Sequence, residues 1–180
     1  LQSAEISPQE AIRRLQEVAA SSPADRAGVE LHTIADLVKY KAEEDPTTLL
    51  GRRWVCQGGQ LLLVGQSGIG KSSLTVQAAM TWALGMPFFG IAPQRPLKSL
   101  YIQAENDAGD MAEVVQGVLS YVVTKSGKTP AEALEMLNEN LVMVRSTAQT
   151  GEEFTALVGD LIQQHGACDL VHADPLLSFI

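Results

Sequence analysis

The sequence predicts an α/β fold in which a mostly parallel sheet is flanked by helices. From Gly51 onward, short apolar runs alternate with longer segments whose apolar residues recur at helical spacing. Glycines and prolines separate these segments. The 180 residues are 46% hydrophobic and 19% charged, which suits one core of ordinary domain size. A repeated strand–helix alternation of this kind is typical of a parallel sheet covered by helices.

Residues 1–50 predict a helical segment and a linker, and residues 51–180 the α/β core. Residues 8–20 begin after a serine cap with a proline at the first helical position, and they carry an apolar stripe. Residues 21–27 are small and polar, so we expect a linker there. A second helical segment is expected near residues 33–44, before an Asp-Pro pair that ends it.

Within the core, strands and helices are expected to alternate. Strands are expected at residues 53–56, 60–64, 99–103, 141–144 and 170–173. Helices are expected at residues 70–84, 107–123, 130–137 and 152–165. The helix at 70–84 is apolar nearly all round, so it should pack against neighbours on several sides. Asp107 and Asp110 have the spacing of a capping pair for the helix that they begin.

Composition excludes several classes of protein. Thirteen basic and 21 acidic side chains give a net charge of −8, so the chain as a whole is not a basic nucleic-acid or anionic-lipid binder. Its apolar stretch at residues 76–92 is interrupted by polar residues, Gly85 and Pro87, so no membrane span is expected. Cys56 and Cys168 lie far apart, without partners at metal-ligand or redox spacing. We interpret them as buried thiols in a cytoplasmic protein.

The two ends of the sequence suggest a longer protein. The first residue is Leu1 rather than a methionine, and Ile180 comes only six residues after Asp174, where a predicted strand ends. We therefore expect a core that is incomplete at its C-terminus.

One motif carries a specific chemistry. Residues 65–72 read GQSGIGKS and match the phosphate-binding pattern G-x-x-x-x-G-K-[ST] between a predicted strand and a predicted helix. Its glycines let successive backbone N–H groups point at phosphate oxygens, at the positive end of the helix. Lys71 can span the β- and γ-phosphates, and the Ser72 hydroxyl can ligate Mg²⁺. The expected nucleotide-binding residues are Gly65, Gln66, Ser67, Gly68, Ile69, Gly70, Lys71, Ser72 and Ser73, of which Ser73 also fits as an ordinary helix residue.

Two carboxylates complete the candidate site. Asp174 follows the strand at 170–173 and is expected to orient the magnesium shell, the alternative being a strand-end cap. Glu105 follows the strand at 99–103 and is the candidate general base for water, because the ends of parallel strands converge on one edge of a sheet. Lys71 and Glu105 are thus the candidate catalytic residues. His172 is either a core histidine or a γ-phosphate sensor.

Together these residues resemble the RecA-like AAA family ATPases of the RepA type, which are related to ring-forming replicative helicases such as DnaB. The resemblance spans roughly residues 50–180 and rests on the loop at 65–72, the strand ending in Gln103-Ala104-Glu105, and the strand ending in Asp174-Pro175-Leu176. It implies a RecA-like core that binds ATP with Mg²⁺, hydrolyses it through Glu105, and assembles into a hexameric ring on single-stranded DNA. It also implies a role as a DNA helicase in replication.

This sequence departs from that family in one respect. In the family, an arginine from the neighbouring subunit and DNA-contacting loops usually follow the strand that ends here at Asp174. The sequence has six more residues, none of them basic. From Tyr101 onward there are 12 acidic residues and three basic ones, so a track along a phosphate backbone is not expected in this part.

Several alternatives stay open. Residues 52–54, Arg-Arg-Trp, have two interpretations. They could stack on adenine or contact a nucleic-acid strand, or they could form an exposed basic edge with a half-buried tryptophan. The helix at residues 8–20 either docks on a neighbouring subunit or packs on its own domain. A nucleotide-dependent switch or assembly module is the alternative function. A P-loop kinase is less favoured, because only Arg95 and Arg145 follow the phosphate-binding loop.

Overall fold

The computed structural model describes Arg13 and residues 32–180. The chain divides into two units, residues 1–41 and 42–180, and each is treated by itself. Apart from Arg13, which is helical, the expected helix at residues 8–20 and the linker at 21–27 lie outside the described residues.

In the first unit, the helix α2 spans Ile34–Val38. Thr33 caps it, because its hydroxyl accepts a hydrogen bond from the Asp36 N–H and the Asp36 carboxylate accepts one from the Thr33 N–H. The second expected helical segment therefore begins where the sequence predicts. It is shorter than expected, and the short 3₁₀ helix η1, Ala42–Glu44, follows in the second unit.

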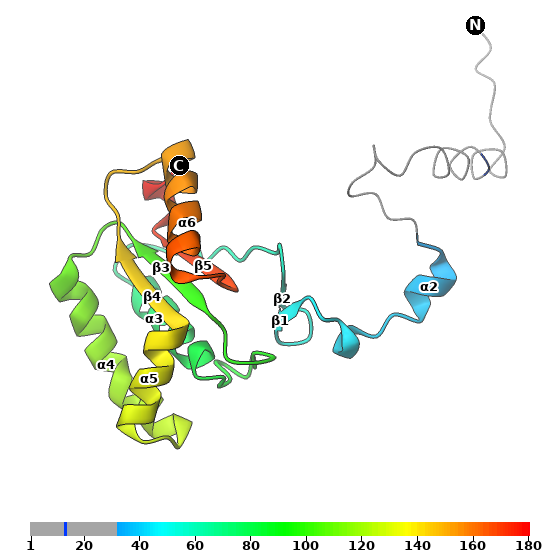
Figure 1. Cartoon of the computed structure of the whole chain (residues 1–180), viewed down its shortest axis with the longest axis horizontal. Helices are drawn as coiled ribbons and strands as arrows, with labels where there is room; N and C mark the ends of the chain where they lie inside the picture. Colours follow the sequence, from blue (N-terminus) through cyan, green and yellow to red (C-terminus); the bar gives the residue numbers. More distant parts are fainter. Residues whose placement is uncertain (1–12, 14–31) are drawn as a thin grey trace, which may run out of the picture. The chain divides into compact units, whose positions relative to one another are not determined.

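The second unit alternates strands and helices (Figure 1). After η1, its elements are β1 (Thr48–Leu50), β2 (Val55–Cys56), α3 (Lys71–Ala83), β3 (Ser99–Gln103), α4 (Ala108–Ser126), α5 (Pro130–Asn140), β4 (Leu141–Arg145), α6 (Gly151–His165), β5 (Leu170–Asp174) and the 3₁₀ helix η2 (Leu176–Ser178). The expected helices and the last three expected strands are each present, with ends shifted by at most a few residues. The short strand β1 was not predicted.

The main sheet is parallel and has three strands in the order β4-β3-β5. Gln103 on β3 lies opposite Arg145 on β4 and Asp174 on β5, so the carboxyl ends of all three strands reach the same edge. β1 and β2 form a separate antiparallel pair. The parallel sheet flanked by helices confirms the predicted α/β fold.

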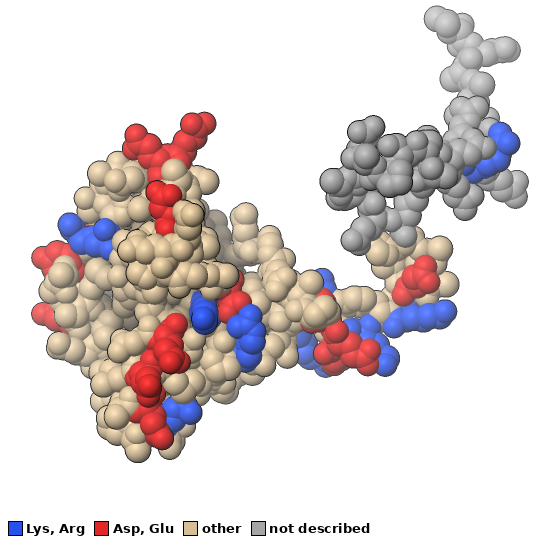
Figure 2. All heavy atoms as spheres, in the orientation of Figure 1, with Lys and Arg blue, Asp and Glu red and all other residues tan. Residues whose placement is uncertain are grey.

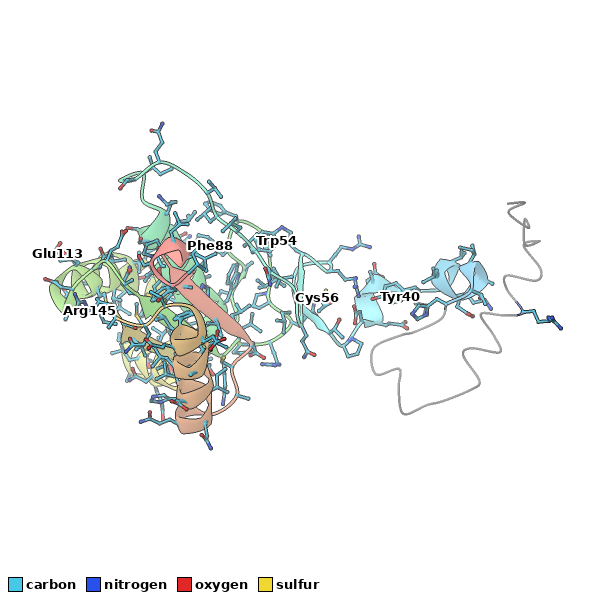
Figure 3. All side chains as sticks on the ribbon, turned by 90° about the horizontal axis from the view of Figure 1, so that it is seen from above. Tyr40, Trp54, Cys56, Phe88, Glu113 and Arg145 are labelled. Atoms are coloured by element: carbon cyan, nitrogen blue, oxygen red, sulfur yellow. The ribbon has the colours of Figure 1, made fainter. Side chains whose placement is uncertain are left out.

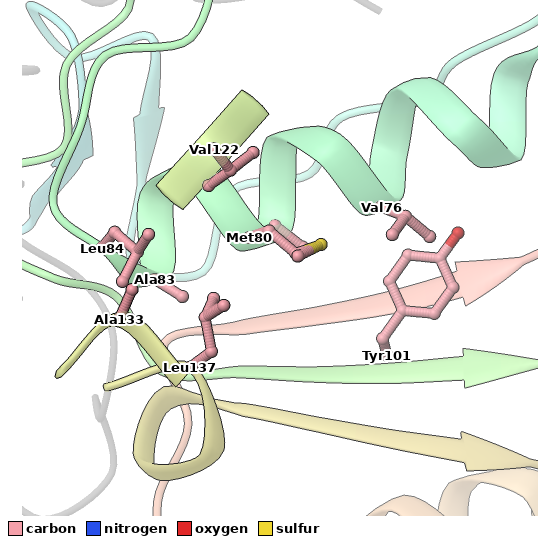
Figure 4. Packing of buried hydrophobic residues seen from close by; sticks show 9 residues of the cluster. Val76, Met80, Ala83, Leu84, Tyr101, Val122, Ala133 and Leu137 are labelled. Carbon is pink, nitrogen blue, oxygen red and sulfur yellow. The ribbon is translucent and has the colours of Figure 1, made fainter. Parts of the chain in front are cut away.

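Helices cover both faces of this sheet. Successive side chains of β3 point to opposite faces, so β3 packs against helices on each side. Tyr101 faces a buried cluster that joins α3, α4 and α5 to the sheet, and Figure 4 shows it beside Val76. That cluster consists of Val76, Ala79, Met80, Ala83, Leu84, Tyr101, Val122, Ala133 and Leu137. Leu100 and Ile102 face the opposite way and pack with Phe179 and with α6. The core is therefore built in three layers.

Helix α3 packs on more than one side, as its composition predicts. Its residues Ala78 and Trp82 belong to a second buried cluster with β1, β2 and Leu97. The Trp82 ring meets Trp54 and Phe88 edge-on, with ring centroids 6.4 and 6.1 Å away. Trp54 and Phe88 are labelled in Figure 3. α3 thereby joins the β1–β2 pair to the main sheet.

One predicted strand is wrong. Residues 60–64 are extended but form no β-ladder, and Leu61 to Val64 are between 45% and 80% exposed. A continuous apolar run predicts a strand buried on both faces, which requires neighbouring strands and covering helices. Among the described residues, neither a strand nor a helix covers this segment. The segment that precedes the phosphate-binding loop is therefore exposed instead of lying in the sheet.

Two expectations about burial and membranes can be compared with the structure. Among the described residues, no helix is both long enough and apolar enough to cross a membrane. Cys56 and Cys168 are free thiols, each only half-buried rather than fully buried. Partial burial is sufficient to raise the pKa of the Cys168 thiol.

Candidate functional site

The loop at residues 65–70 is exposed and leads directly into α3. Gly68 and Gly70 have φ angles of 78° and 89°, in the left-handed region that favours glycine. Gly70 is the N-cap of α3 and supplies no side-chain cap, and no acidic residue lies in the first turn. The first N–H groups of the helix are therefore left for another acceptor, at the end where an anion is favoured.

Lys71 folds back over this loop. Its Nζ donates hydrogen bonds to the carbonyl oxygens of Gly65 and Gln66, at 3.0 and 2.7 Å. Both acceptors are uncharged, so the positive charge of the ammonium group is not neutralised by them. An ammonium group has three N–H donors, so one remains for an anion at the loop.

The first turn of α3 also places the two serines. Ser72 is half-buried and Ser73 is exposed. The Ser72 carbonyl oxygen lies 3.0 Å from the hydroxyl of Thr75, one turn further along the helix. The Ser72 hydroxyl makes no hydrogen bond among the described residues, which leaves it available to a ligand.

Asp174 lies at the end of β5 and is held by buried neighbours. Its Oδ2 accepts hydrogen bonds from the Tyr101 hydroxyl at 2.8 Å and from Gln103 Nε2 at 3.2 Å. The Tyr101 hydroxyl is also 2.7 Å from Thr75 Oγ1 on α3. These four residues, Thr75, Tyr101, Gln103 and Asp174, form what we call the Asp174 network. Asp174 is therefore tied to the helix that carries Lys71 and Ser72.

Gln103, a member of the Asp174 network, also holds the backbone of Glu105. The Glu105 N–H donates to Gln103 Oε1 at 3.2 Å, and the N–H of Ala104 donates to the same oxygen at 2.9 Å. The residue is exposed, and its carboxylate makes no hydrogen bond or ion pair within the described part of the chain. The Glu105 backbone is thus fixed at the edge where β5 ends, while its side chain remains open to water.

His172 lies beside Asp174 on the same face of β5. Its ring stacks on Tyr101, with centroids 5.4 Å apart and planes at 21°. Its Nε2 is buried and has no hydrogen-bond partner within the described residues. Burial lowers the pKa of His172 to about 4, so the ring is neutral near pH 7. Of the two predicted roles, the core position agrees with this stacking, although the ring is not a satisfied core histidine.

Other predicted residues lie outside this group. Asp107 and Asp110 form the reciprocal capping box of α4, as predicted. Arg52 pairs with Glu43, and Arg53 pairs with Asp45. This pairing agrees with an exposed basic edge. On the face of residues 42–180 shown in Figure 2, basic side chains lie in small groups beside acidic ones.

Sequence reasoning missed the network residues Thr75, Tyr101 and Gln103. A signal for two of them is present in the sequence. Tyr101 and Gln103 alternate on one strand face in the same way as His172 and Asp174. What the sequence does not give is the register that sets Gln103 opposite Asp174.

Comparison with known families decides the broader identity of the chain. The family described as AAA domain matches residues 24–180, which is most of the sequence. The chain belongs to the AAA domain family. No curated protein and no solved structure matches the chain. Membership in the AAA domain family indicates a nucleotide-binding domain with ATPase activity in general, typically with Mg²⁺.

The residues of this AAA domain fit a nucleotide with Mg²⁺. Both donors to Asp174 reach Oδ2, so Oδ1 has no hydrogen-bond donor among the described residues. One carboxylate oxygen and one hydroxyl are the kind of small oxygen set that Mg²⁺ takes from a protein when phosphates and waters complete its shell, so Asp174 and Ser72 are the residues that would hold it. In the described part of the AAA domain, no cluster of three or more His, Cys, Asp or Glu side chains could hold a metal.

Proposed function

We propose that this AAA domain binds ATP with Mg²⁺ and hydrolyses it to ADP and phosphate. The observation that carries the proposal is the Asp174 network. Through Tyr101 and Thr75 it ties the Asp174 carboxylate to the helix turn that carries Lys71 and Ser72. Through Gln103 it ties Asp174 to the backbone of Glu105. A phosphate-binding loop, a metal-directed carboxylate and a candidate base thus belong to one connected structure.

Each residue then has a defined role. The loop N–H groups at residues 65–70 and the Lys71 ammonium bind the phosphate oxygens. Ser72 and Asp174 hold Mg²⁺, which when bound neutralises charge that develops on the phosphates. The Glu105 carboxylate accepts a proton from the attacking water. The new bond joins the water oxygen to the γ-phosphorus, and the bond between the γ-phosphorus and the bridging oxygen breaks, with its electrons passing to ADP.

We propose further that this ATPase core belongs to a ring-forming DNA motor of the RepA type. Support comes from the resemblance of the three motifs at residues 65–72, 103–105 and 174–176. The three strands that carry or flank the second and third motifs end at one edge of the sheet. A motor of this kind would act as a homo-oligomer, with single-stranded DNA as its partner.

The experiment that tests the ATPase proposal compares the unmodified protein with Lys71→Ala. We expect the variant to bind ATP at least tenfold more weakly, because it loses a charge-assisted contact to phosphate. Lys128→Ala is the matched control, since Lys128 follows α4 at a distance from the loop along the chain. Calorimetric titration with ATP measures both. Equal ATP affinity of Lys71→Ala and the unmodified protein would contradict the proposed site.

A second experiment tests the motor proposal. Steady-state ATP hydrolysis is measured with and without single-stranded DNA, and the mass of the protein in solution is measured with nucleotide. Stimulation by DNA together with a multimer is expected. A monomer whose turnover ignores DNA would favour a nucleotide-dependent switch instead, with Lys71 and Ser72 acting only in binding.

A further inference from the structure

We propose that Tyr101 and Gln103 are positioning residues that hold the Asp174 carboxylate ready for Mg²⁺. The inference deepens the proposed function and rests on it. Both side chains lie behind the site rather than in it, since Tyr101 is 1% and Gln103 2% exposed. Each of them reaches Asp174 from the neighbouring strand β3.

Tyr101 is held in place from three directions. Its ring packs in the core cluster beside α3 and also stacks on the ring of His172. Its hydroxyl contacts Thr75 on α3 and donates to Asp174. A carboxylate can only accept a hydrogen bond, so the phenol is the donor in its contact with Asp174.

Thr75 extends this contact to the phosphate-binding turn. Its hydroxyl lies 3.0 Å from the Ser72 carbonyl and 3.2 Å from the Lys71 carbonyl, as well as 2.7 Å from the Tyr101 hydroxyl. The single phenol proton is given to Asp174, so the contact between Thr75 and Tyr101 requires the threonine to donate. A displacement of the first turn of α3 would therefore shift the Tyr101 hydroxyl and the hydrogen bond that it donates to the Asp174 carboxylate.

Gln103 links the two carboxylate residues of the site. Its amide N–H group donates to Asp174, and its amide oxygen accepts from the N–H groups of Ala104 and Glu105. Only one orientation of the amide satisfies both sides, because a carboxylate can only accept and a backbone N–H can only donate. Gln103 therefore fixes the position of Asp174 relative to the backbone of Glu105.

These hydrogen bonds give the two carboxylate oxygens of Asp174 different roles. Both hydrogen bonds reach Oδ2, so the side chain cannot rotate without breaking them. Oδ1 accepts no hydrogen bond from the described residues and is available to a cation. Ligands held in this manner by neighbouring hydrogen bonds bind metal more tightly, because less freedom is lost when the metal arrives.

Magnesium titration of ADP binding tests the proposal without relying on activity. ADP affinity is measured by calorimetry in the absence of Mg²⁺ and at increasing Mg²⁺, for the full protein and for Tyr101→Phe. We expect the Mg²⁺ concentration that gives the half-maximal gain in affinity to rise roughly 10- to 100-fold in the variant. The affinity for ADP without Mg²⁺ should not change. Tyr121→Phe is the matched control, because Tyr121 is 54% exposed on α4.

A second variant separates Gln103 from Tyr101. Gln103→Met keeps the length of the side chain but loses the contacts to Asp174 and to Glu105. It should shift the Mg²⁺ titration in the same direction as Tyr101→Phe and, in addition, lower kcat more than it raises KM. Gln164→Met, at an exposed position on α6, controls for the substitution itself.

The outcomes distinguish this inference from the function on which it rests. If the unmodified protein binds no ADP at any Mg²⁺ concentration, the proposed function fails and the inference fails with it. If the unmodified protein shows the Mg²⁺-dependent gain and both folded variants show the same gain at the same Mg²⁺ concentration, the positioning role alone is overturned. A loss of ADP affinity that is equal with and without Mg²⁺ would also overturn it, since that pattern indicates a general structural effect.

Discussion

At the scale of single residues, two carboxylates at one sheet edge have different surroundings. Asp174 accepts two hydrogen bonds from buried side chains and cannot rotate freely. Glu105 is exposed, and within the described residues its carboxylate has no partner. A fixed carboxylate suits an ion of defined geometry, whereas an open one suits proton transfer from water. The two residues are therefore suited to different parts of the proposed reaction.

Substituting Glu105 tests this division. Glu105→Gln keeps the size of the side chain but removes its basicity, so we expect kcat for ATP hydrolysis to fall by roughly 10² to 10⁴. The affinity for ADP with Mg²⁺ should stay within about twofold of the parent, because no contact to phosphate is lost. Glu113→Gln, at an exposed position on α4 (Figure 3), is the matched control. An unchanged kcat in Glu105→Gln would rule out the assignment of a general base.

At the scale of elements, helix starts could be predicted well from sequence because capping is local. Asp107 with Asp110 has the expected spacing for the capping box that begins α4. The β3 strand was predicted to the residue, since its apolar run is buried on both faces. The segment at residues 60–64 has the same kind of pattern but pairs with no strand. Local pattern gives the propensity of a strand, whereas its partner is a property of the tertiary fold.

The site shows the same division between local and long-range information. The sequence indicated the loop at residues 65–72, Glu105 and Asp174, because each follows a strand or precedes a helix in a known pattern. It did not indicate Tyr101 or Gln103, whose importance depends on a register between strands about 70 residues apart in the chain. Residues that contact a ligand have recognisable motifs, while the residues that hold them are defined by packing.

A helix cap that was not predicted offers a test at this scale. The Thr129 hydroxyl accepts from the Glu132 N–H at 3.3 Å, and the Glu132 carboxylate accepts from the Thr129 N–H at 2.9 Å. Thr129→Ala should lower the free energy of unfolding by about 1 kcal/mol, because the Glu132 N–H loses the hydroxyl oxygen that accepts its hydrogen bond at the start of α5. Thr124→Ala is the control, since Thr124 is exposed inside α4 and alanine is the better helix former.

Urea unfolding measures both variants. A loss in Thr129→Ala no larger than that in Thr124→Ala would show that the capping box does not contribute to the stability of the fold.

At the scale of the whole molecule, one ion pair joins segments that are far apart in the chain. Arg95, ahead of β3, donates two hydrogen bonds to Asp169, just before β5, at 2.8 and 2.6 Å. The Lys98 N–H donates to the same carboxylate at 2.8 Å. The side chain of Asp169 is 13% exposed and that of Arg95 56%. This pair therefore helps to align the beginnings of the two strands whose other ends carry the site.

The pair predicts how stability depends on pH. Burial by itself would raise the pKa of Asp169, but the hydrogen bonds from Arg95 and the Lys98 N–H outweigh it and lower the pKa below its usual value. Folding therefore favours the ionised carboxylate. Its contribution is fully present above the unfolded pKa, about 3.9, and is lost as pH falls through the lower pKa of the folded state.

Arg95→Met should consequently lower the free energy of unfolding by about 1–2 kcal/mol at pH 7, because a two-point, charge-assisted contact is lost. The difference between the variant and the parent should shrink as pH falls below the unfolded pKa of about 3.9, because the unfolded chain then binds a proton at Asp169 more readily than the folded parent does, and the contribution is lost through the lower folded pKa. Arg52→Met is the control, since the Arg52–Glu43 pair is mostly exposed and should contribute less. Urea unfolding at pH 7, 5 and 3.5 measures all three proteins. If the loss in Arg95→Met is as large at pH 3.5 as at pH 7, the side chain of Arg95 stabilises the fold through packing and not through its charge.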